Sequence, residues 1–231
     1  MGSTRLPGKS MMLLGNKTIV GGILERVKKC KAIDKIVLAI PDTKENDILT
    51  LEARNEGICC FRGSESDCLD RYYQAAKYYG ADIVGRLPAD NPVPDPVEID
   101  RVAQHHRSLG RNGFSTNLAE IMGSGYPDGL GAEMFDFELL HDAWEKNKDP
   151  EKREHVHLNF FNYKTGLAVE PEKCPVSFPE CPAYLRNLGL VLDINTKEDY
   201  LKFREMFQHY QNLGIHNVST DHVIRWFESK P

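Results

Sequence analysis

The residues best suited to chemistry lie between positions 2 and 9. This stretch combines glycines, hydroxyl side chains and two cations in the order Gly2, Ser3, Thr4, Arg5, Leu6, Pro7, Gly8 and Lys9. Glycine lets backbone N–H groups approach anionic oxygens closely, and turns of this kind form anion-binding nests. The pattern predicts a loop that wraps a polyphosphate, with Arg5 as a bidentate fork and Lys9 as a compact charge. A disordered basic tip has the same composition and stays open as the alternative.

A P-loop is a second interpretation of the same residues. A Walker A motif has four residues between its first glycine and its Gly-Lys pair. Here five residues separate Gly2 from Gly8, and Pro7 has no backbone donor to offer a phosphate. The spacing therefore disfavours a P-loop NTPase or kinase.

A carboxylate follows an apolar run farther along the chain. Asp90 comes just after residues 82–87 and is flanked by Pro88 and Pro92. Mg²⁺ takes one or two carboxylates and completes its shell with phosphate and water, so Asp90 suits a magnesium ion. An Asx turn before Pro92 is the alternative.

The elements that must position these groups alternate along the chain. Apolar runs typical of buried strands occupy residues 35–40, 58–61, 82–87 and 188–195. Amphipathic stretches typical of helices occupy residues 19–31, 46–57, 69–80, 96–108, 135–146, 200–208 and 218–227. This alternation predicts an α/β fold with a doubly wound, mainly parallel sheet that binds ligands at the carboxyl ends of its strands. The glycine-rich residues 110–131 predict loops around an acceptor pocket.

Bulk properties set limits on the partners. A length of 231 residues suits one domain, residues 1–231. The net charge of −5 gives no general nucleic-acid or membrane footprint, although a local basic loop still binds a small anion. No run of about 18 apolar residues is present, so we expect no membrane span. The six cysteines form no CxxC pair, which indicates reduced thiols and a cytoplasmic location.

Residues 2–9 resemble the signature loop of nucleotide-sugar pyrophosphorylases and cytidylyltransferases. The nearest branch is similar to the spore coat polysaccharide biosynthesis protein F family, relatives of CMP-Kdo and CMP-sialate synthetases. The resemblance implies a Rossmann-like fold of the nucleotide-diphospho-sugar transferase type. In that family a short apolar strand precedes the loop, and the sequence opens at Met1. We therefore expect this first strand to be missing from residues 1–231.

Two further segments resemble nucleotide-binding motifs of the family. Residues 62–72 are similar to Arg-Gly-Ser-x-x-Asp-Val-Leu-Asp-Arg-Tyr, and residues 89–92 to Gly-Asp-x-Pro, whose aspartate binds the catalytic Mg²⁺. Helix capping by Ser64 and Asp67 is an alternative that is compatible with ligand binding. The resemblance implies that Arg5, Lys9 and Asp90 are catalytic. It implies nucleotide binding by Gly2, Ser3, Thr4, Gly8, Arg62, Gly63, Ser64, Asp70, Arg71, Arg86 and Ala89.

The acceptor side of the site resembles two other patterns. Residues 127–133 are similar to Pro-Asp-Gly-Leu-Asp-x-Glu, with Gly131 in place of the second aspartate, and residues 153–156 match Arg-Glu-His-Val. The resemblance implies acceptor binding by Asn117, Asp128, Glu133, Glu154 and His155. It also implies a homodimer, for which residues 110–131 could serve as the arm.

A second metal ligand is expected near residue 193. The segment resembles the family's Val-Asp-Thr-Pro-Glu-Asp-Leu element, and Asn195 stands at its aspartate position. Residues two apart on a strand face the same side, so Asp193 could still supply a carboxylate. Gly131 and Asn195 both remove negative charge from the expected site, which favours an anionic acceptor.

Together these features predict a Mg²⁺-dependent cytidylyltransferase. It would couple CMP from CTP to a sugar acid, phosphonate or phosphomonoester in surface-glycan or related small-molecule biosynthesis, and would release pyrophosphate. A non-catalytic nucleotide-binding or assembly subunit is the main alternative, and a P-loop enzyme is the weaker one.

Overall fold

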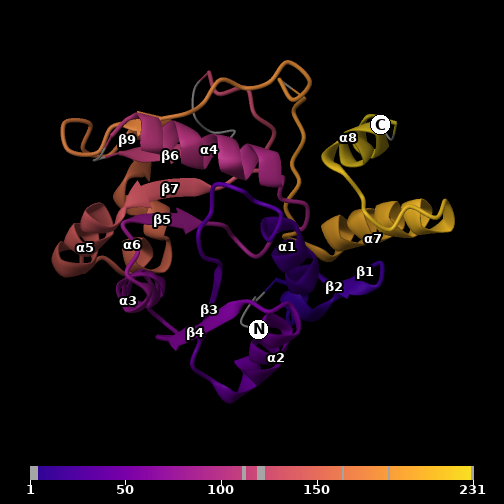
Figure 1. Cartoon of the computed structure of the whole chain (residues 1–231), viewed down its shortest axis with the longest axis horizontal. Helices are drawn as coiled ribbons and strands as arrows, with labels where there is room; N and C mark the ends of the chain where they lie inside the picture. The colour runs from indigo at the N-terminus through magenta and orange to yellow at the C-terminus, as the bar shows by residue number, and fades with distance from the viewer. Residues whose placement is uncertain (1–4, 111–112, 119–122, 163, 187, 230–231) are drawn as a thin grey trace.

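The chain forms an α/β structure in which the largest sheet has four strands. The computed structural model describes residues 5–110, 113–118, 123–162, 164–186 and 188–229. The sheet runs in the order β10 (Val176–Ser177), β6 (Phe114–Thr116), β7 (Glu133–Asp136) and β5 (Ile83–Arg86) (Figure 1). The α/β class predicted from the sequence is therefore confirmed.

The sheet is mixed, so the expectation of a mainly parallel sheet is wrong. Strand β10 pairs with β6 in parallel, but β7 runs antiparallel to both β6 and β5. Parallel neighbours in a sheet need a crossover of a dozen or more residues, which is usually a helix. The described residues between β6 and β7 include no helix, which fits the antiparallel direction of β7. A separate parallel pair is formed by β3 (Val37–Pro41) and β4 (Cys59–Gly63). The described residues include no strand pairing between this pair and β5.

Two short antiparallel pairs complete the strands. They join β1 (Leu13–Leu14) to β2 (Lys17–Thr18), and β8 (Phe161–Asn162) to β9 (Leu167–Ala168).

Strand β6 corrects the prediction of continuous loops over residues 110–131. Phe114, Ser115 and Thr116 have no exposed surface and lie between β10 and β7. The two hydroxyl residues concealed this strand in the sequence because they break the apolar pattern. The expected acceptor and dimer roles of this region stay predictions.

The helices closely follow the amphipathic pattern. Their bounds are α1 (Ile19–Val27), α2 (Asp47–Asn55), α3 (Cys68–Tyr79), α4 (Pro96–Ser108), α5 (Phe137–Lys146), α6 (Pro150–Glu154), α7 (Lys197–Asn212) and α8 (Thr220–Glu228). Three 3₁₀ turns are η1 (Lys9–Met11), η2 (Lys44–Asn46) and η3 (Val156–Asn159). Helix α5 begins two residues later than expected because Phe135 and Asp136 belong to β7.

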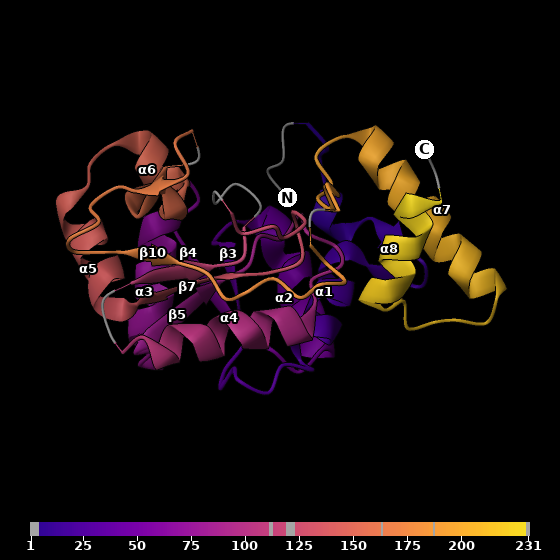
Figure 2. The ribbon, with the colours of Figure 1, turned by 90° about the horizontal axis from the view of Figure 1, so that it is seen from above.

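Helices cover both faces of the four-stranded sheet. Figure 2 shows α4 along one side of the strands and α6 on the other. Ile99 and Val102 of α4 belong to a buried cluster with Met134, whereas Leu69 of α3 clusters with Phe135. Adjacent residues of β7 thus face opposite layers, as the pleat of a strand requires.

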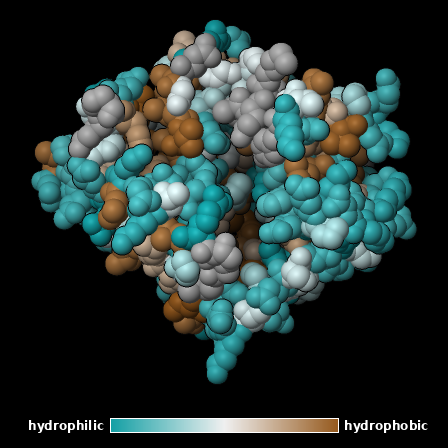
Figure 3. Space-filling model, turned by 180° about the vertical axis from the view of Figure 1, so that it is seen from behind, coloured by the Kyte–Doolittle hydropathy of each residue, from teal (hydrophilic) through white to brown (hydrophobic). Residues whose placement is uncertain are grey.

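Helices α7 and α8 lie together at the end of the molecule opposite α5 (Figures 1 and 2). Phe203 and Met206 of α7 share a buried cluster with Ile19 and Ile23 of α1 and with Ile224 of α8. The surface seen from behind is mostly hydrophilic and is hollowed near its middle, where apolar atoms lie at the bottom (Figure 3). In the described part of the chain, no helix is both long and apolar enough to cross a membrane.

The expected strand over residues 188–195 is not a regular strand. Only Val191 makes a bridge, with Asp128, and Gly189 adopts a left-handed φ of 64° that interrupts the extended backbone. The segment bonds to loops instead: Leu192 N donates to Asp128 O, and Ile194 N donates to Asp90 O. This segment therefore lies beside Asp90, one of the predicted site residues.

Candidate active site

Lys9 and Asp90 lie together although 81 positions separate them in sequence. Gly8 adopts a left-handed φ of 70° that turns the chain into η1, where Lys9 is the first residue. The Lys9 ammonium is 3.7 Å from Asp90 Oδ2 and donates to Ile194 O at 2.7 Å. The Lys9 side chain is only 12% exposed, whereas the Asp90 side chain is 34% exposed. The carboxylate therefore remains accessible to a ligand that approaches from solvent.

The segment around Asp193 joins the same cluster. Ile194 N donates to Asp90 O at 2.8 Å, which places residues 193–195 directly beside Asp90. The Asn195 amide donates to Asp193 Oδ2, and Asn195 N donates to Asp199 Oδ2 at 3.1 Å. The structure thus brings Lys9 together with Asp90 and places the backbone around Asp193 beside Asp90, and the roles of these residues stay predictions.

These residues fit a magnesium ion that takes most of its ligands from a nucleotide. Among the described residues, no group of three or more His, Cys, Asp or Glu side chains could hold a metal alone. Asp90 offers a partly exposed carboxylate, and Asp193 on the neighbouring segment would be the second, within the usual protein share of one or two carboxylates for Mg²⁺ bound to substrate phosphates. The described residues therefore do not form a metal site from protein ligands alone.

A second cluster surrounds Arg86 at the carboxyl end of β5. Arg86 Nη1 donates to Glu133 Oε1 at 2.5 Å, and the Glu133 side chain is only 1% exposed. Burial, together with the charge of Arg86, lowers the pKa of His157 to about 3. Desolvation raises the pKa of Tyr72 to about 12, against the opposing charge of Arg86. At neutral pH this cluster therefore consists of one ion pair with a neutral imidazole and a neutral phenol.

Arg71 lies in the first turn of α3, and its side chain packs on Gly63 at the carboxyl end of β4. A Cβ placed on Gly63 would be 3.1 Å from Arg71 Cγ, so the glycine lets the arginine stem pack closely. Arg71 Nη1 donates to Ser64 O, while Arg71 Nε is buried without a hydrogen-bond partner. Burial raises the pKa of the Cys68 thiol against the charges of Arg71 and Arg86, which places both cations near the start of α3. Within the described chain, Arg71 makes no ion pair with a carboxylate.

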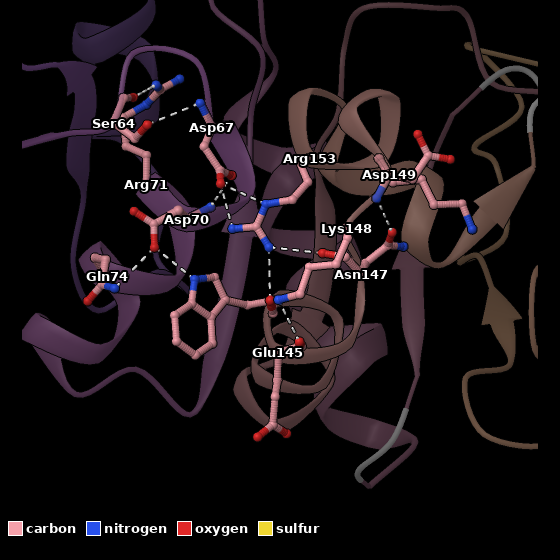
Figure 4. A network of polar contacts seen from close by, with 12 residues as sticks. Ser64, Asp67, Asp70, Arg71, Gln74, Glu145, Asn147, Lys148, Asp149 and Arg153 are labelled. Carbon is pink, nitrogen blue, oxygen red and sulfur yellow. Dashed lines mark hydrogen bonds and ion pairs between the residues drawn. The ribbon is translucent and has the colours of Figure 1, made fainter.

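The capping interpretation of this segment is confirmed for Asp67, whereas Ser64 Oγ accepts from Asp67 N ahead of the helix. Asp67 is the N-cap of α3, where its Oδ1 accepts from Asp70 N at 2.8 Å (Figure 4). Asp67 Oδ2 also accepts from Arg153 Nε at 2.7 Å, which ties α3 to α6. Asp70 Oδ1 accepts from the Trp144 indole at 2.7 Å. Asp70, predicted to bind the nucleotide, is therefore engaged with α5 in this structure.

Arg62 is also engaged. Its Nε donates to Asp42 Oδ1 and its Nη1 donates to Asp47 Oδ1, both at 2.7 Å, and Nη2 donates to Thr43 O at 2.9 Å. A nucleotide would have to compete with two carboxylates for this guanidinium. Its predicted binding role remains a prediction.

The other predicted residues are distributed around these clusters. Arg5 is exposed, Ala89 is exposed beside Asp90, and Glu154 and His155 lie exposed at the end of α6. The predicted binding residues Gly2, Ser3 and Thr4 lie outside the described residues. Asp128 bonds through its backbone to Leu190 and Leu192, and Asn117 is buried next to Gly131.

Tyr72 and His157 are site neighbours that were not among the predicted site residues. Both lie near Arg86, but no role was expected for either: Tyr72 is the last residue of the motif at residues 62–72, and His157 lies outside the matched motifs. Tyr72 follows Arg71 in the matched segment, and His157 lies two positions after His155. Those neighbouring positions were the only signals the sequence offered.

A buried serine, histidine and aspartate on the sheet do not form a second site. His106 Nδ1 lies 2.9 Å from Ser115 Oγ, and His106 Nε2 lies 3.6 Å from Asp136 Oδ1. Ser115 has no exposed surface, and His106 and Asp136 are 2% and 4% exposed. With no access for a substrate, this group joins α4 to the sheet.

Comparisons with known proteins show which chains this one is similar to. A family model described as cytidylyltransferase matches residues 1–215. The spore coat polysaccharide biosynthesis protein SpsF of Bacillus subtilis is 32% identical over 237 residues, covering 100% of this chain and 92% of SpsF. A cytidylyltransferase structure from Leptospira borgpetersenii has a TM-score of 0.77 at 30% identity, covering 90% of this chain and 83% of that chain.

A more distant structure shares the fold. It is a CMP:2-keto-3-deoxy-manno-octonic acid synthetase complexed with CTP, with a TM-score of 0.59 at 14% identity. The match covers 90% of this chain and 95% of that chain.

Proposed function

This chain belongs to the cytidylyltransferase family, and we propose that it transfers CMP from CTP to a small acidic acceptor with the help of Mg²⁺. The family predicted from the sequence motifs is confirmed, and the chain is a CTP-dependent nucleotidyltransferase. The acceptor and the metal are the parts of the proposal that go beyond the family.

The observation that carries the proposal is the contact of Lys9 with Asp90, beside the segment that carries Asp193. A cation next to one carboxylate, with a second carboxylate on the neighbouring segment, offers both parts of a site for a metal-bound triphosphate. Lys9 would hold the phosphates together with Arg5. Asp90, with Asp193 as second ligand, would hold Mg²⁺, which when bound would neutralise charge on the phosphate oxygens.

The transfer itself needs little covalent chemistry from the protein. The acceptor oxygen attacks the α-phosphorus in line, and a new P–O bond forms as the bond to the bridging oxygen of the β-phosphate breaks. Pyrophosphate leaves with that electron pair. Catalysis of this kind depends on positioning and charge stabilisation, which cations such as Lys9 and Arg71 supply.

An acidic acceptor removes the need for a strong general base. A carboxylate or phosphonate is already ionised near neutral pH. Glu133 is ion-paired with Arg86, so we assign it to orientation of the acceptor rather than to proton removal. Asp128 would orient the acceptor as well.

The activities named for similar proteins support an acidic sugar or a related anion as the acceptor. One similar protein acts in spore coat polysaccharide biosynthesis, and another is a synthetase for CMP-linked 2-keto-3-deoxy-manno-octonic acid. By analogy, we place this enzyme in the biosynthesis of a surface glycan or a related small molecule. Residues 131 and 195 carry no acidic side chain, which favours a strongly anionic acceptor such as a phosphonate or phosphomonoester.

A pyrophosphate-release assay tests the proposal. CTP and Mg²⁺ are supplied with one acceptor at a time from three classes: sugar acids, phosphonates and phosphomonoesters. We expect release with at least one acid acceptor, and we expect EDTA to abolish it. Turnover confined to neutral sugars or polyols, or turnover that persists in EDTA, would overturn the acceptor or the metal assignment.

Several sequence expectations remain proposals alongside this one. They are a homodimer, a cytoplasmic location and the lack of nucleic-acid or membrane partners. Membership of an enzyme family disfavours both a non-catalytic subunit and a P-loop NTPase or kinase.

A further inference from the structure

A groove between the last two helices forms a hollow outside the candidate active site. It lies between α7 and α8, at the end of the molecule where these helices pack together (Figures 1 and 2). Its volume is about 660 Å³, within the range of about 300–1,000 Å³ that small-molecule sites span. We call it the α7–α8 groove.

The α7–α8 groove is remote from the residues around Asp90. The N-cap of α7 is Thr196, next to Asn195, whereas Asn212 in the groove is the last residue of this helix. The 16 residues of α7, at about 1.5 Å each, put about 24 Å between its two ends. Helix α8 lies beyond residue 215, where the match to the cytidylyltransferase family model ends. The proposed transfer reaction therefore does not account for this groove.

Aromatic rings supply the apolar part of the groove lining. The Trp226 ring centroid lies 4.9 Å from that of His209 and 6.4 Å from that of Tyr210. Tyr210 is buried, and its hydroxyl donates to His222 O at 2.7 Å, so this side chain joins α7 to α8. Trp226 is only partly buried. Its indole is therefore the large ring that still has surface to offer a ligand.

The polar part of the lining is suited to hydroxyl groups rather than to a charged ligand. Glu205, Gln208 and Asn212 are spaced by three and four residues, so they share one face of α7. Each of the two amides carries both an oxygen acceptor and an NH₂ donor. Arg225, on the α8 side, is paired with Asp221 at 2.9 Å. An anion would have to compete with Asp221 for Arg225 and would be repelled by Glu205.

We propose that the α7–α8 groove binds a neutral pyranose unit of a saccharide, with a C–H face of the sugar on the Trp226 indole and its hydroxyl groups on Gln208 and Asn212. A pyranose has hydroxyl groups around its rim and C–H groups on its faces. It therefore matches a site that combines an aromatic ring with side chains that both donate and accept hydrogen bonds.

The two tryptophans of the chain make a direct test possible. Their indole N–H groups give separate signals in a proton–nitrogen NMR correlation spectrum, and Trp226→Phe identifies the Trp226 signal by removing it. The full chain is titrated with the methyl glycosides of glucose, galactose, mannose and N-acetylglucosamine, up to about 100 mM. We expect at least one glycoside to shift the Trp226 signal with a Kd of about 1–10 mM, as is typical of a ligand with few atoms.

Trp144 provides the internal reference. It belongs to α5, at the opposite end of the molecule, where it stacks on Tyr73 at 4.1 Å and donates to Asp70. Its indole signal should stay constant during the same titration. CTP serves as the charged ligand for comparison, and it should leave the Trp226 signal unchanged.

Two glutamine variants separate sugar binding from a general change in α7. Gln208 lines the groove, whereas Gln211 of the same helix lies beside Gly15 and does not line it. We expect Gln208→Ala to raise the Kd for the glycoside by about 5-fold or more, and Gln211→Ala to leave it unchanged. Thermal melting checks that each variant is folded, and if one is not, the wild-type titration decides.

Three results would overturn the proposal. The first is a Trp226 signal that none of the four glycosides shifts. The second is a Trp144 signal that moves together with the Trp226 signal, since the sugar would then act on the whole fold. The third is an equal Kd in wild type and Gln208→Ala.

Discussion

At the scale of single residues, the cations near the site differ in how their charge is neutralised. Lys9 lies beside Asp90, and Arg86 is paired with Glu133. Arg71 makes no ion pair within the described chain, and its guanidinium donates to Ser64 O, a neutral carbonyl. A half-buried cation without a carboxylate partner is well suited to an incoming anion.

This difference predicts a binding defect on substitution of Arg71. Arg71→Met keeps most of the aliphatic stem that packs on Gly63 but removes the charge. We expect the KM for CTP to rise by about 10-fold or more, as expected for loss of a charge-assisted hydrogen bond. Steady-state kinetics with CTP as the varied substrate measures the effect.

The matched control is Arg225→Met. Arg225 is exposed on α8, where it pairs with Asp221, four positions earlier. It should show wild-type kinetics. An Arg71→Met enzyme with an unchanged KM for CTP would remove Arg71 from the nucleotide site.

At the scale of elements, Asp67 connects three helices through one carboxylate. It caps α3 and accepts from Arg153 of α6, and Arg153 in turn donates to Trp144 O near the end of α5 (Figure 4). The Asp67 and Arg153 side chains are 26% and 16% exposed, so the pair is partly shielded from water. Partial burial makes such a pair worth more than a surface salt bridge.

Stability measurements can separate the two roles of Asp67. Asn is a good N-cap residue, so Asp67→Asn should lose the ion pair alone and lower the free energy of unfolding by about 1–2 kcal/mol. Asp67→Ala should lose about 1 kcal/mol more because the cap is lost as well. Urea denaturation measures both, and equal losses in the two variants would contradict the capping role.

Much of this architecture could be predicted because long periodic segments specify their own structure. Helix α4 has the predicted bounds, and α1, α2 and α3 differ from prediction by only a few residues. Strand β6 could not be predicted because its polar side chains are satisfied by distant partners, such as His106 for Ser115. Residues 188–195 have an apolar pattern that fits a strand, but their hydrogen bonds go to loops at Asp90 and Asp128.

The candidate site, too, could be predicted from the sequence only in part. Lys9 and Asp90 could be predicted because each lies in a motif, and the structure places them together. The contacts of Arg62 and Asp70 with other side chains could not be predicted, because they depend on how α2 and α5 pack. The close contact between Asn117 and Gly131 could not be predicted either, because it depends on the pairing of β6 with β7.

At the scale of the whole molecule, buried histidines make stability depend on pH. Burial lowers the pKa of His157 to about 3, and it also lowers the pKa of His106. In the unfolded chain an imidazole has a pKa near 6.5. Below that pH the unfolded state binds more protons than the folded state, so stability falls as the pH falls.

We therefore expect the free energy of unfolding to decrease between pH 7 and pH 5. The slope below pH 6.5 should reach about 1.4 kcal/mol per pH unit for each histidine that stays neutral in the folded state. Urea denaturation at several pH values measures it, and NMR titration should show that the His157 imidazole stays neutral at pH 5. His216→Gln, at an exposed position, should leave the slope nearly unchanged. A flat profile would contradict the burial of His157.

The central claim is that Lys9 and Asp90 form the phosphate and metal end of the CTP site. Equilibrium titration of CTP in the presence of Mg²⁺ tests it most directly, with wild type, Lys9→Ala and the control Lys17→Ala. Lys17 pairs with Glu56 and Glu25 rather than with Asp90. The account predicts that CTP binds about 10-fold or more weakly to Lys9→Ala and equally well to Lys17→Ala. Wild-type affinity in Lys9→Ala would contradict it.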